Sequence, residues 1–130
     1  MTGSNQKILL VDDDNDLILA LSKILEAKGY AVISAPNSTI GMEKAKQELP
    51  DLLIIDVMME KFSEGFTFIQ SLMAEQVTKD IPRILLTALG IQENLDAISP
   101  QELGTVRILR KPVLTDALLD AVKSAIAVKR

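Results

Sequence analysis

Carboxylates, a hydroxyl and an ammonium group each follow a short apolar run of this sequence. In chain order they are Asp12, Asp13, Asp14, Asp56, Thr87 and Lys111. Gathered carboxylates raise one another's pKa, so such a cluster usually persists because a cation is bound there. Oxygen ligands alone point to Mg²⁺, and Mg²⁺ beside a carboxylate and a lysine is an arrangement for phosphoryl transfer. A carboxylate can itself be the nucleophile, and Asp56 is our candidate because it ends a central, buried run.

The composition excludes several other chemistries. The 130 residues include no Cys and no His, so disulfides, thiolate or imidazole metal sites and histidine bases are excluded within this chain. A net charge of −4 indicates no basic face for direct nucleic-acid binding. No apolar run approaches the ~20 residues of a membrane span, and the polar start lacks a signal-peptide core. We therefore expect a cytoplasmic protein without membrane or nucleic-acid contacts.

Five apolar runs alternate with five helical patterns along the chain. Strands are expected at 7–12, 30–35, 52–56, 83–87 and 106–109, and helices at 17–28, 40–49, 66–76, 91–98 and 115–128. Four of the runs are nearly continuously apolar, which is typical of strands buried on both faces of a parallel sheet. The pattern predicts an α/β fold, a five-stranded parallel sheet of order 2-1-3-4-5 doubly wound with five helices, as in flavodoxin-like proteins. Residues 1–6 are expected to be a flexible lead-in and 7–130 a single domain.

The predicted sheet explains how distant residues meet. Ligands of open α/β sheets bind beyond the carboxyl ends of the strands, where the strand order reverses. The first and third strands flank that point, and the fourth and fifth lie beside the third. The acidic run at 12–14, Asp56, Thr87 and Lys111 should therefore converge on one crevice.

The segments KILLVDDD, PDLLIIDVMM, IPRILLTAL and RKPV, in this order, resemble the receiver domain of two-component response regulators (CheY-like). The resemblance covers nearly the whole chain. It implies that Asp56 accepts a phosphoryl group from a histidine kinase or a histidine phosphotransfer protein. It also implies that Asp12 and Asp13, an oxygen of Asp56 and the backbone carbonyl of Met58 surround Mg²⁺, with Asp13 a direct ligand.

The same resemblance assigns the groups that would contact the phosphoryl oxygens. They are the hydroxyl of Thr87, the backbone N–H of Ala88 and the ammonium of Lys111, with a cis bond between Lys111 and Pro112. The family's members are regulatory phosphoacceptors that catalyse only their own phosphorylation and dephosphorylation. The face formed by the helix expected at 91–98, the strand at 106–109 and the helix at 115–128 would bind a downstream protein, and it is the family's usual surface for a homodimer.

Two departures from the family pattern leave alternatives open. Glu60 stands where members commonly have Pro, with one residue more before Gly65, and Ile108 stands where an aromatic residue is common. These departures favour an alternative, a pseudo-receiver that binds partners without phosphorylation. A third hypothesis is a phosphatase of the haloacid dehalogenase type, suggested by Asp12-x-Asp14 after an apolar strand, although the chain is short for that family and lacks a cap.

Overall fold

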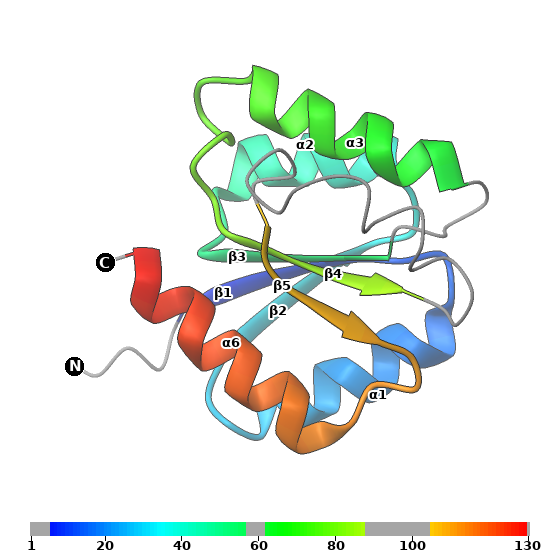
Figure 1. The fold of residues 1–130 in the computed structure, drawn as a ribbon, viewed down its shortest axis with the longest axis vertical. Helices are drawn as coiled ribbons and strands as arrows, with labels where there is room; N and C mark the ends of the chain where they lie inside the picture. Colours follow the sequence, from blue (N-terminus) through cyan, green and yellow to red (C-terminus); the bar gives the residue numbers. More distant parts are fainter. Residues whose placement is uncertain (1–5, 57–61, 88–104, 130) are drawn as a thin grey trace.

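A five-stranded parallel sheet forms the centre of the computed structural model, which describes residues 6–56, 62–87 and 105–129 (Figure 1). The strands are β1 (Lys7–Val11), β2 (Ala31–Ala35), β3 (Leu52–Asp56), β4 (Arg83–Thr87) and β5 (Thr105–Arg110). Their order is β2-β1-β3-β4-β5, and every neighbouring pair is parallel. The predicted topology is therefore confirmed, and the point where the strand order reverses lies between β1 and β3.

Two layers of helices cover the sheet. The helices are α1 (Asn15–Glu26), α2 (Ser38–Glu48), α3 (Phe62–Ala74) and α6 (Thr115–Lys129). One face of the sheet carries α2 and α3, and the opposite face carries α1 and α6 (Figure 1). Four of the five expected helices are thus observed, while the helix expected at 91–98 lies outside the described residues.

The third helix begins at Phe62, four residues before the predicted start at 66. The prediction placed the Ser-Glu-Gly stretch at 63–65 in the loop that follows Asp56. The later helix residues Phe68, Ile69 and Leu72 are almost fully buried against the sheet. Packing of these residues anchors the helix on the sheet, and the helix continues through Gly65 at its beginning.

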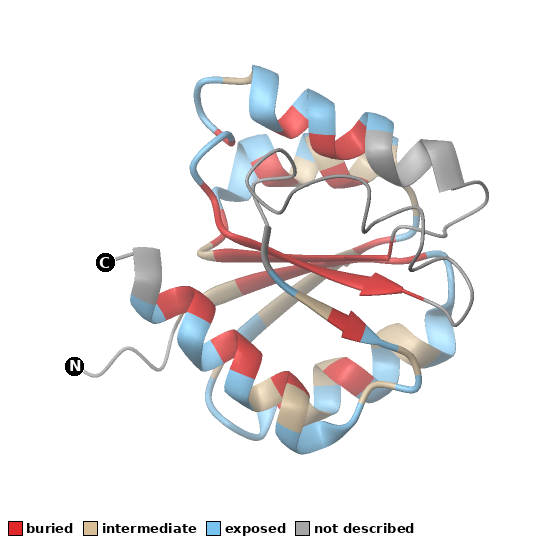
Figure 2. Cartoon of the chain, in the orientation of Figure 1, coloured by how far each residue is buried: buried red, intermediate tan, exposed pale blue. Residues whose placement is uncertain are grey.

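Alternation along the central strands divides the core into two layers. Leu9, Leu53 and Ile55 pack on the α2–α3 side. Ile8, Leu10, Leu52 and Ile54 pack on the α1–α6 side. Successive side chains of a strand point to opposite faces, so a run such as Leu52–Asp56 must be apolar throughout when both faces are covered. Figure 2 shows β3 and β4 buried along their length between half-exposed helices.

Local signals place α1 at the end of β1. Asp14 is the N-cap, and its Oδ1 accepts hydrogen bonds from the backbone N–H groups of Asp16 (3.0 Å) and Leu17 (3.2 Å). After α1 the chain turns at Gly29, whose φ of 93° is readily adopted only by glycine, and then enters β2. No helix in the described part of the chain is long and apolar enough to cross a membrane.

Candidate functional site

Two carboxylates meet where the strand order reverses. Asp56 is the last residue of β3, and Asp12 directly follows β1, with its backbone N–H donating to the carbonyl of Ala35 at 3.1 Å. Each is only 3% exposed. Because β1 and β3 are paired in register up to Val11 and Ile55, the next residue of each strand lies at the same edge of the sheet. The predicted convergence of these two residues is confirmed.

Lys111 brings an ammonium group to the same place from the end of β5. Its Nζ donates a hydrogen bond to Oδ2 of Asp56 at 3.0 Å and lies 3.6 Å from Oδ2 of Asp12. Its backbone N–H donates to the carbonyl of Thr87 at 2.8 Å, which ties the end of β5 to the end of β4. The bond between Lys111 and Pro112 is cis, as the resemblance implied.

Sequence reasoning missed three of these contacts. It assigned Lys111 to a phosphoryl oxygen and did not predict the hydrogen bond to Asp56, the ion pair with Asp12 or the backbone bond to Thr87. The signal for the backbone bond was present, because neighbouring parallel strands that end together can continue their hydrogen-bond ladder by one residue.

Three carboxylates are close enough to share a cation. Oxygen atoms of Asp12, Asp13 and Asp56 lie within 4.8 Å of one another, and Asp13 is exposed while the other two are buried. Ligands on opposite sides of a Mg²⁺ lie about 4.2 Å apart, so only small side-chain movements would be needed. Three carboxylates and one ammonium leave two negative charges when all are ionised, which suits a divalent cation. The residues therefore fit Mg²⁺.

The pKa values of Asp12 and Lys111 also indicate a site that favours a bound cation. Burial raises the pKa of the Asp12 carboxyl from 3.8 to about 6, and the nearby Asp56 carboxylate adds to this, against the Asp14 N–H and the Lys111 ammonium. Burial acts to lower the pKa of Lys111, but its hydrogen bond and charge interactions with Asp56 and Asp12 outweigh burial and raise it. Charge on Asp12 is therefore costly here, whereas charge on Lys111 is favoured.

Two buried oxygen atoms of the site lack hydrogen bonds within the described structure. Oδ2 of Asp12 has only the ion pair with Lys111, and Oγ1 of Thr87, which is 0% exposed, has no hydrogen-bond partner among the described residues. Buried polar groups are usually satisfied, so unsatisfied ones at the same edge of a sheet indicate a place for a ligand. The hydroxyl of Thr87 could donate to an oxygen of such a ligand.

The remaining residues singled out from the sequence either lie beside the site or fall outside the described residues. Asp14 caps α1, and its backbone N–H donates to Oδ1 of Asp12 at 3.0 Å. Ile108 is half-buried and packs against the core on the α2–α3 side. Met58 and Ala88 lie outside the described residues, as does Glu60.

Known proteins share both the sequence pattern and the fold. The response regulator receiver domain family matches residues 8–123. The DNA-binding dual master transcriptional regulator RpaA of Synechocystis is 36% identical over 91% of this chain and 48% of its own length. The alkaline phosphatase synthesis transcriptional regulatory protein PhoP of Bacillus subtilis is 35% identical over 83% of this chain and 43% of its own. The chain thus spans about half the length of the curated relatives it matches.

Solved structures agree with these relatives. A putative response regulator from Chloroflexus aurantiacus superposes with a TM-score of 0.83 and 30% identity, covering 95% of this chain and 98% of its own. A response regulator receiver domain protein from Clostridium thermocellum gives 0.84 and 28% identity, covering 95% and 96%. With the family match over residues 8–123, these comparisons establish that the chain belongs to the response regulator receiver domain family.

Proposed function

We propose that the chain is a phosphorylation-dependent switch whose Asp56 accepts a phosphoryl group from a phosphohistidine. The donor would be a histidine kinase or a histidine phosphotransfer protein, since this chain has no histidine. The observation that carries the proposal is the cluster of buried Asp12 and Asp56 with half-buried Lys111, with Nζ–Oδ2 distances of 3.6 Å and 3.0 Å. A carboxylate at a strand end, beside an ammonium and further carboxylates, is arranged for phosphoryl transfer.

The proposed Mg²⁺ ligands are the carboxylates of Asp12, Asp13 and Asp56 and the backbone carbonyl of Met58. Support comes from the mutual distances of the three carboxylates, within 4.8 Å. When bound, Mg²⁺ would neutralise charge on the phosphoryl oxygens and on the carboxylates. A cation would also offset the cost of holding Asp12 ionised, which its pKa of about 6 reflects.

The chain's own residues would act on the phosphoryl group as follows. One oxygen of Asp56 attacks the phosphorus, the phosphorus–nitrogen bond of the donor breaks, and the imidazole leaves with the bonding electron pair. The ammonium group of Lys111 then pairs with a phosphoryl oxygen instead of the carboxylate oxygens. Its distance of 3.0 Å from Oδ2 of Asp56 favours this exchange. The Thr87 hydroxyl and the Ala88 backbone N–H donate to the remaining oxygens. Water later attacks the phosphorus and releases phosphate, so the domain is regulatory and catalyses only its own modification.

Phosphorylation adds about −1.5 to −2 of charge and three acceptor oxygens at this edge of the sheet. The proposed readout is the face of β5, α6 and the segment 91–98, which would bind a downstream protein or a second copy. Support comes from Lys111, which links the site to β5 and, four residues later, to the start of α6. With Ile108 in place of an aromatic residue, the switch would act through aliphatic packing rather than through a ring that changes its burial.

Incubation with acetyl phosphate and Mg²⁺, followed by intact-mass measurement, tests the proposal. We expect a gain of one phosphoryl group that is lost in Asp56→Asn and kept in Asp80→Asn, a matched change at an exposed acid before β4. A gain that survives Asp56→Asn contradicts the proposal. Failure to bind Mg²⁺ together with no mass gain would favour the phosphorylation-independent interaction module.

A further inference from the structure

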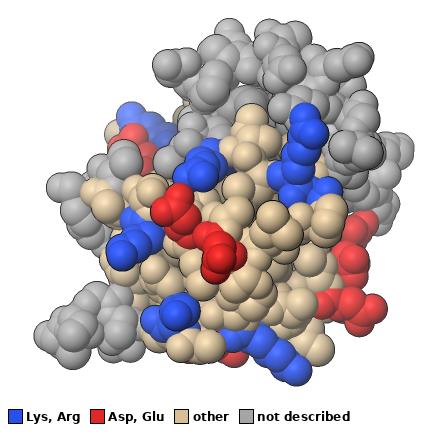
Figure 3. Space-filling model, turned by 60° about the horizontal axis from the view of Figure 1, so that its bottom comes forward, with Lys and Arg blue, Asp and Glu red and all other residues tan. Residues whose placement is uncertain are grey.

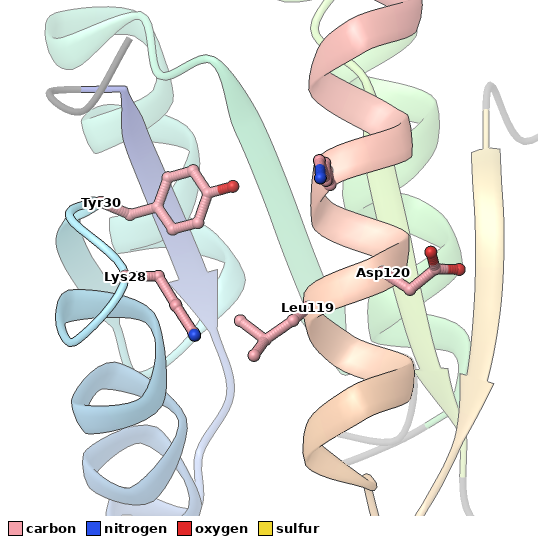
Figure 4. Close-up of a pocket in the computed structure, with 5 residues that line it drawn as sticks. Lys28, Tyr30, Leu119 and Asp120 are labelled. Atoms are coloured by element: carbon pink, nitrogen blue, oxygen red, sulfur yellow. The ribbon is translucent and has the colours of Figure 1, made fainter. Parts of the chain in front are cut away.

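A cleft opens between the end of α1 and the middle of α6, away from the candidate phosphoacceptor site. Its volume is about 370 Å³, and it is lined by Lys28, Tyr30, Leu119, Asp120 and Lys123. Lys28 and Tyr30 belong to the turn that joins α1 to β2, whereas the other three lie on α6. In Figure 4, Lys28 and Tyr30 on one wall and Leu119 on the other point into the gap.

The charge inside this cleft is positive. The carboxylate of Asp120 is directed toward β5 (Figure 4), where its Oδ2 pairs with Nη1 of Arg107 at 3.3 Å. Lys28 and Lys123 form no ion pair within the described ranges. Lys123 follows Leu119 by four residues and so lies on the same face of α6. Two ammonium groups without carboxylate partners therefore flank an apolar floor.

This local charge is not part of a broad basic surface. On the side of the molecule that carries α1 and α6, basic and acidic side chains are interspersed among uncharged ones (Figure 3). The chain as a whole has a net charge of −4. An anionic partner would therefore be attracted to this cleft in particular and not to the domain in general.

The lining favours a peptide over a small molecule. Sites for small molecules usually bury most of the ligand among precisely placed polar groups. Here both lysines are exposed, and Tyr30 and Leu119 are only half-buried. The ammonium groups are on long side chains, and the Asp120 carboxylate is already paired with Arg107. Only the Tyr30 hydroxyl is therefore a fixed polar group inside the cleft. A tyrosine and a leucine surrounded by charged rim residues resemble the centre and rim of a protein interface.

We infer that this cleft binds an acidic segment of a partner protein, with carboxylates on Lys28 and Lys123 and an apolar side chain on Leu119 and Tyr30. The cleft lies on the α1–α6 side, and none of its lining residues contributes to the phosphoacceptor site. Binding should therefore not require phosphorylation of Asp56.

The test is a titration of the ¹⁵N-labelled chain with the peptide Glu-Glu-Leu-Glu-Glu, followed by amide chemical shifts without Mg²⁺ or phosphoryl donor. We expect shifts clustered at the turn before β2 and along the α6 residues of the cleft, with a Kd below about 1 mM. Binding should weaken with added salt, and Gln-Gln-Leu-Gln-Gln should bind at least threefold more weakly.

Charge-reversal variants complete the test. Lys28→Glu and Lys123→Glu should each weaken binding roughly threefold to tenfold, whereas Lys79→Glu, the same change at an exposed lysine before β4, should leave it unaltered. Unchanged spectra outside the cleft will show that the variants are folded. The inference is overturned if the acidic peptide causes no shifts or if the neutral peptide binds equally well. It is also overturned if the cleft amides shift only with ATP, a small anionic ligand, or only with rising concentration of the chain, which would indicate a second copy as the partner. None of these results depends on whether Asp56 is phosphorylated.

Discussion

Replacing Asp12 by Asn should stabilise the metal-free protein at neutral pH, although Asp12 lies in the candidate metal site. The carboxyl is 3% exposed, and its pKa is raised from 3.8 to about 6. A pKa that is higher in the folded protein than in the unfolded chain means that ionisation opposes folding. Asn keeps an oxygen that can accept the bond from the Asp14 N–H but carries no charge.

The expected gain in the free energy of unfolding follows from the size of the pKa change of Asp12. A rise from 3.8 to about 6 corresponds to roughly 3 kcal/mol of lost stability when Asp12 is fully ionised. Asn also places N–H groups near the ammonium of Lys111, 3.6 Å from Oδ2 in the native pair, so only part of this should be recovered. We expect a gain of about 1–2 kcal/mol, which shifts the urea midpoint by roughly 1 M.

The stabilisation by Asp12→Asn should also depend on pH. The penalty is absent below pH 3.8, grows as pH rises from 3.8 to about 6, and is complete above that. The advantage of Asp12→Asn should therefore be large near neutral pH and nearly vanish near pH 4. Urea unfolding in EDTA at both pH values measures it, with Asp16→Asn, an exposed acid of the first turn of α1, as the control.

Mg²⁺ should reduce the stability advantage of Asp12→Asn over the native protein. A ligand that binds only the folded state stabilises it in proportion to the logarithm of its concentration over Kd. Because Asp12→Asn removes a metal-site carboxylate, about 10 mM Mg²⁺ should stabilise the native protein more than the variant. If the variant is less stable than the native protein in EDTA at neutral pH, or if its advantage is equal near pH 4, burial of a charged Asp12 is not the controlling effect.

Three further variants test other parts of the structure by urea unfolding. Lys111→Met removes the ammonium group that lies 3.0 Å from Asp56 and should lower the free energy of unfolding by about 1–3 kcal/mol in EDTA. The cost should be smaller than for a fully buried ion pair, because Lys111 is 26% exposed. Unchanged stability would contradict the pairing. Thr87→Val removes a buried hydroxyl that has no hydrogen-bond partner among the described residues and should stabilise the metal-free protein by about 1 kcal/mol; a loss would mean that the hydroxyl is satisfied. At Gly41 even a Cβ would lie 3.1 Å from Cζ of Phe68, so Gly41→Val should cost about 1–3 kcal/mol, and a stability gain would refute this close packing of α2 on the core.

Strand positions were predictable because burial on both faces leaves a clear mark on the sequence. The bounds of β3 and β4 agree with the expected 52–56 and 83–87 to the residue. Helix ends were less predictable. The third helix begins at Phe62, four residues before its predicted start, although glycine at position 65 lowers the local helix propensity.

Within the site, residue types were predictable and their pairing was not. The sequence placed Asp12, Asp13, Asp56 and Lys111 at one edge because parallel strands end together, and the structure agrees. The resemblance to receiver domains implied Asp13 as a direct metal ligand but said nothing of Asp13 being exposed while Asp12 is buried.

The sequence by itself therefore determined the order of elements, the sheet topology and the residues that share the crevice. These depend on local periodicity and on the right-handedness of parallel crossovers, both of which act along the chain. Only the tertiary structure decided the raised pKa of Asp12, the unsatisfied hydroxyl of Thr87 and the cleft between Lys28 and Lys123. Desolvation and Coulomb energies depend on distances between atoms in space, and the residues concerned lie tens of positions apart in the chain.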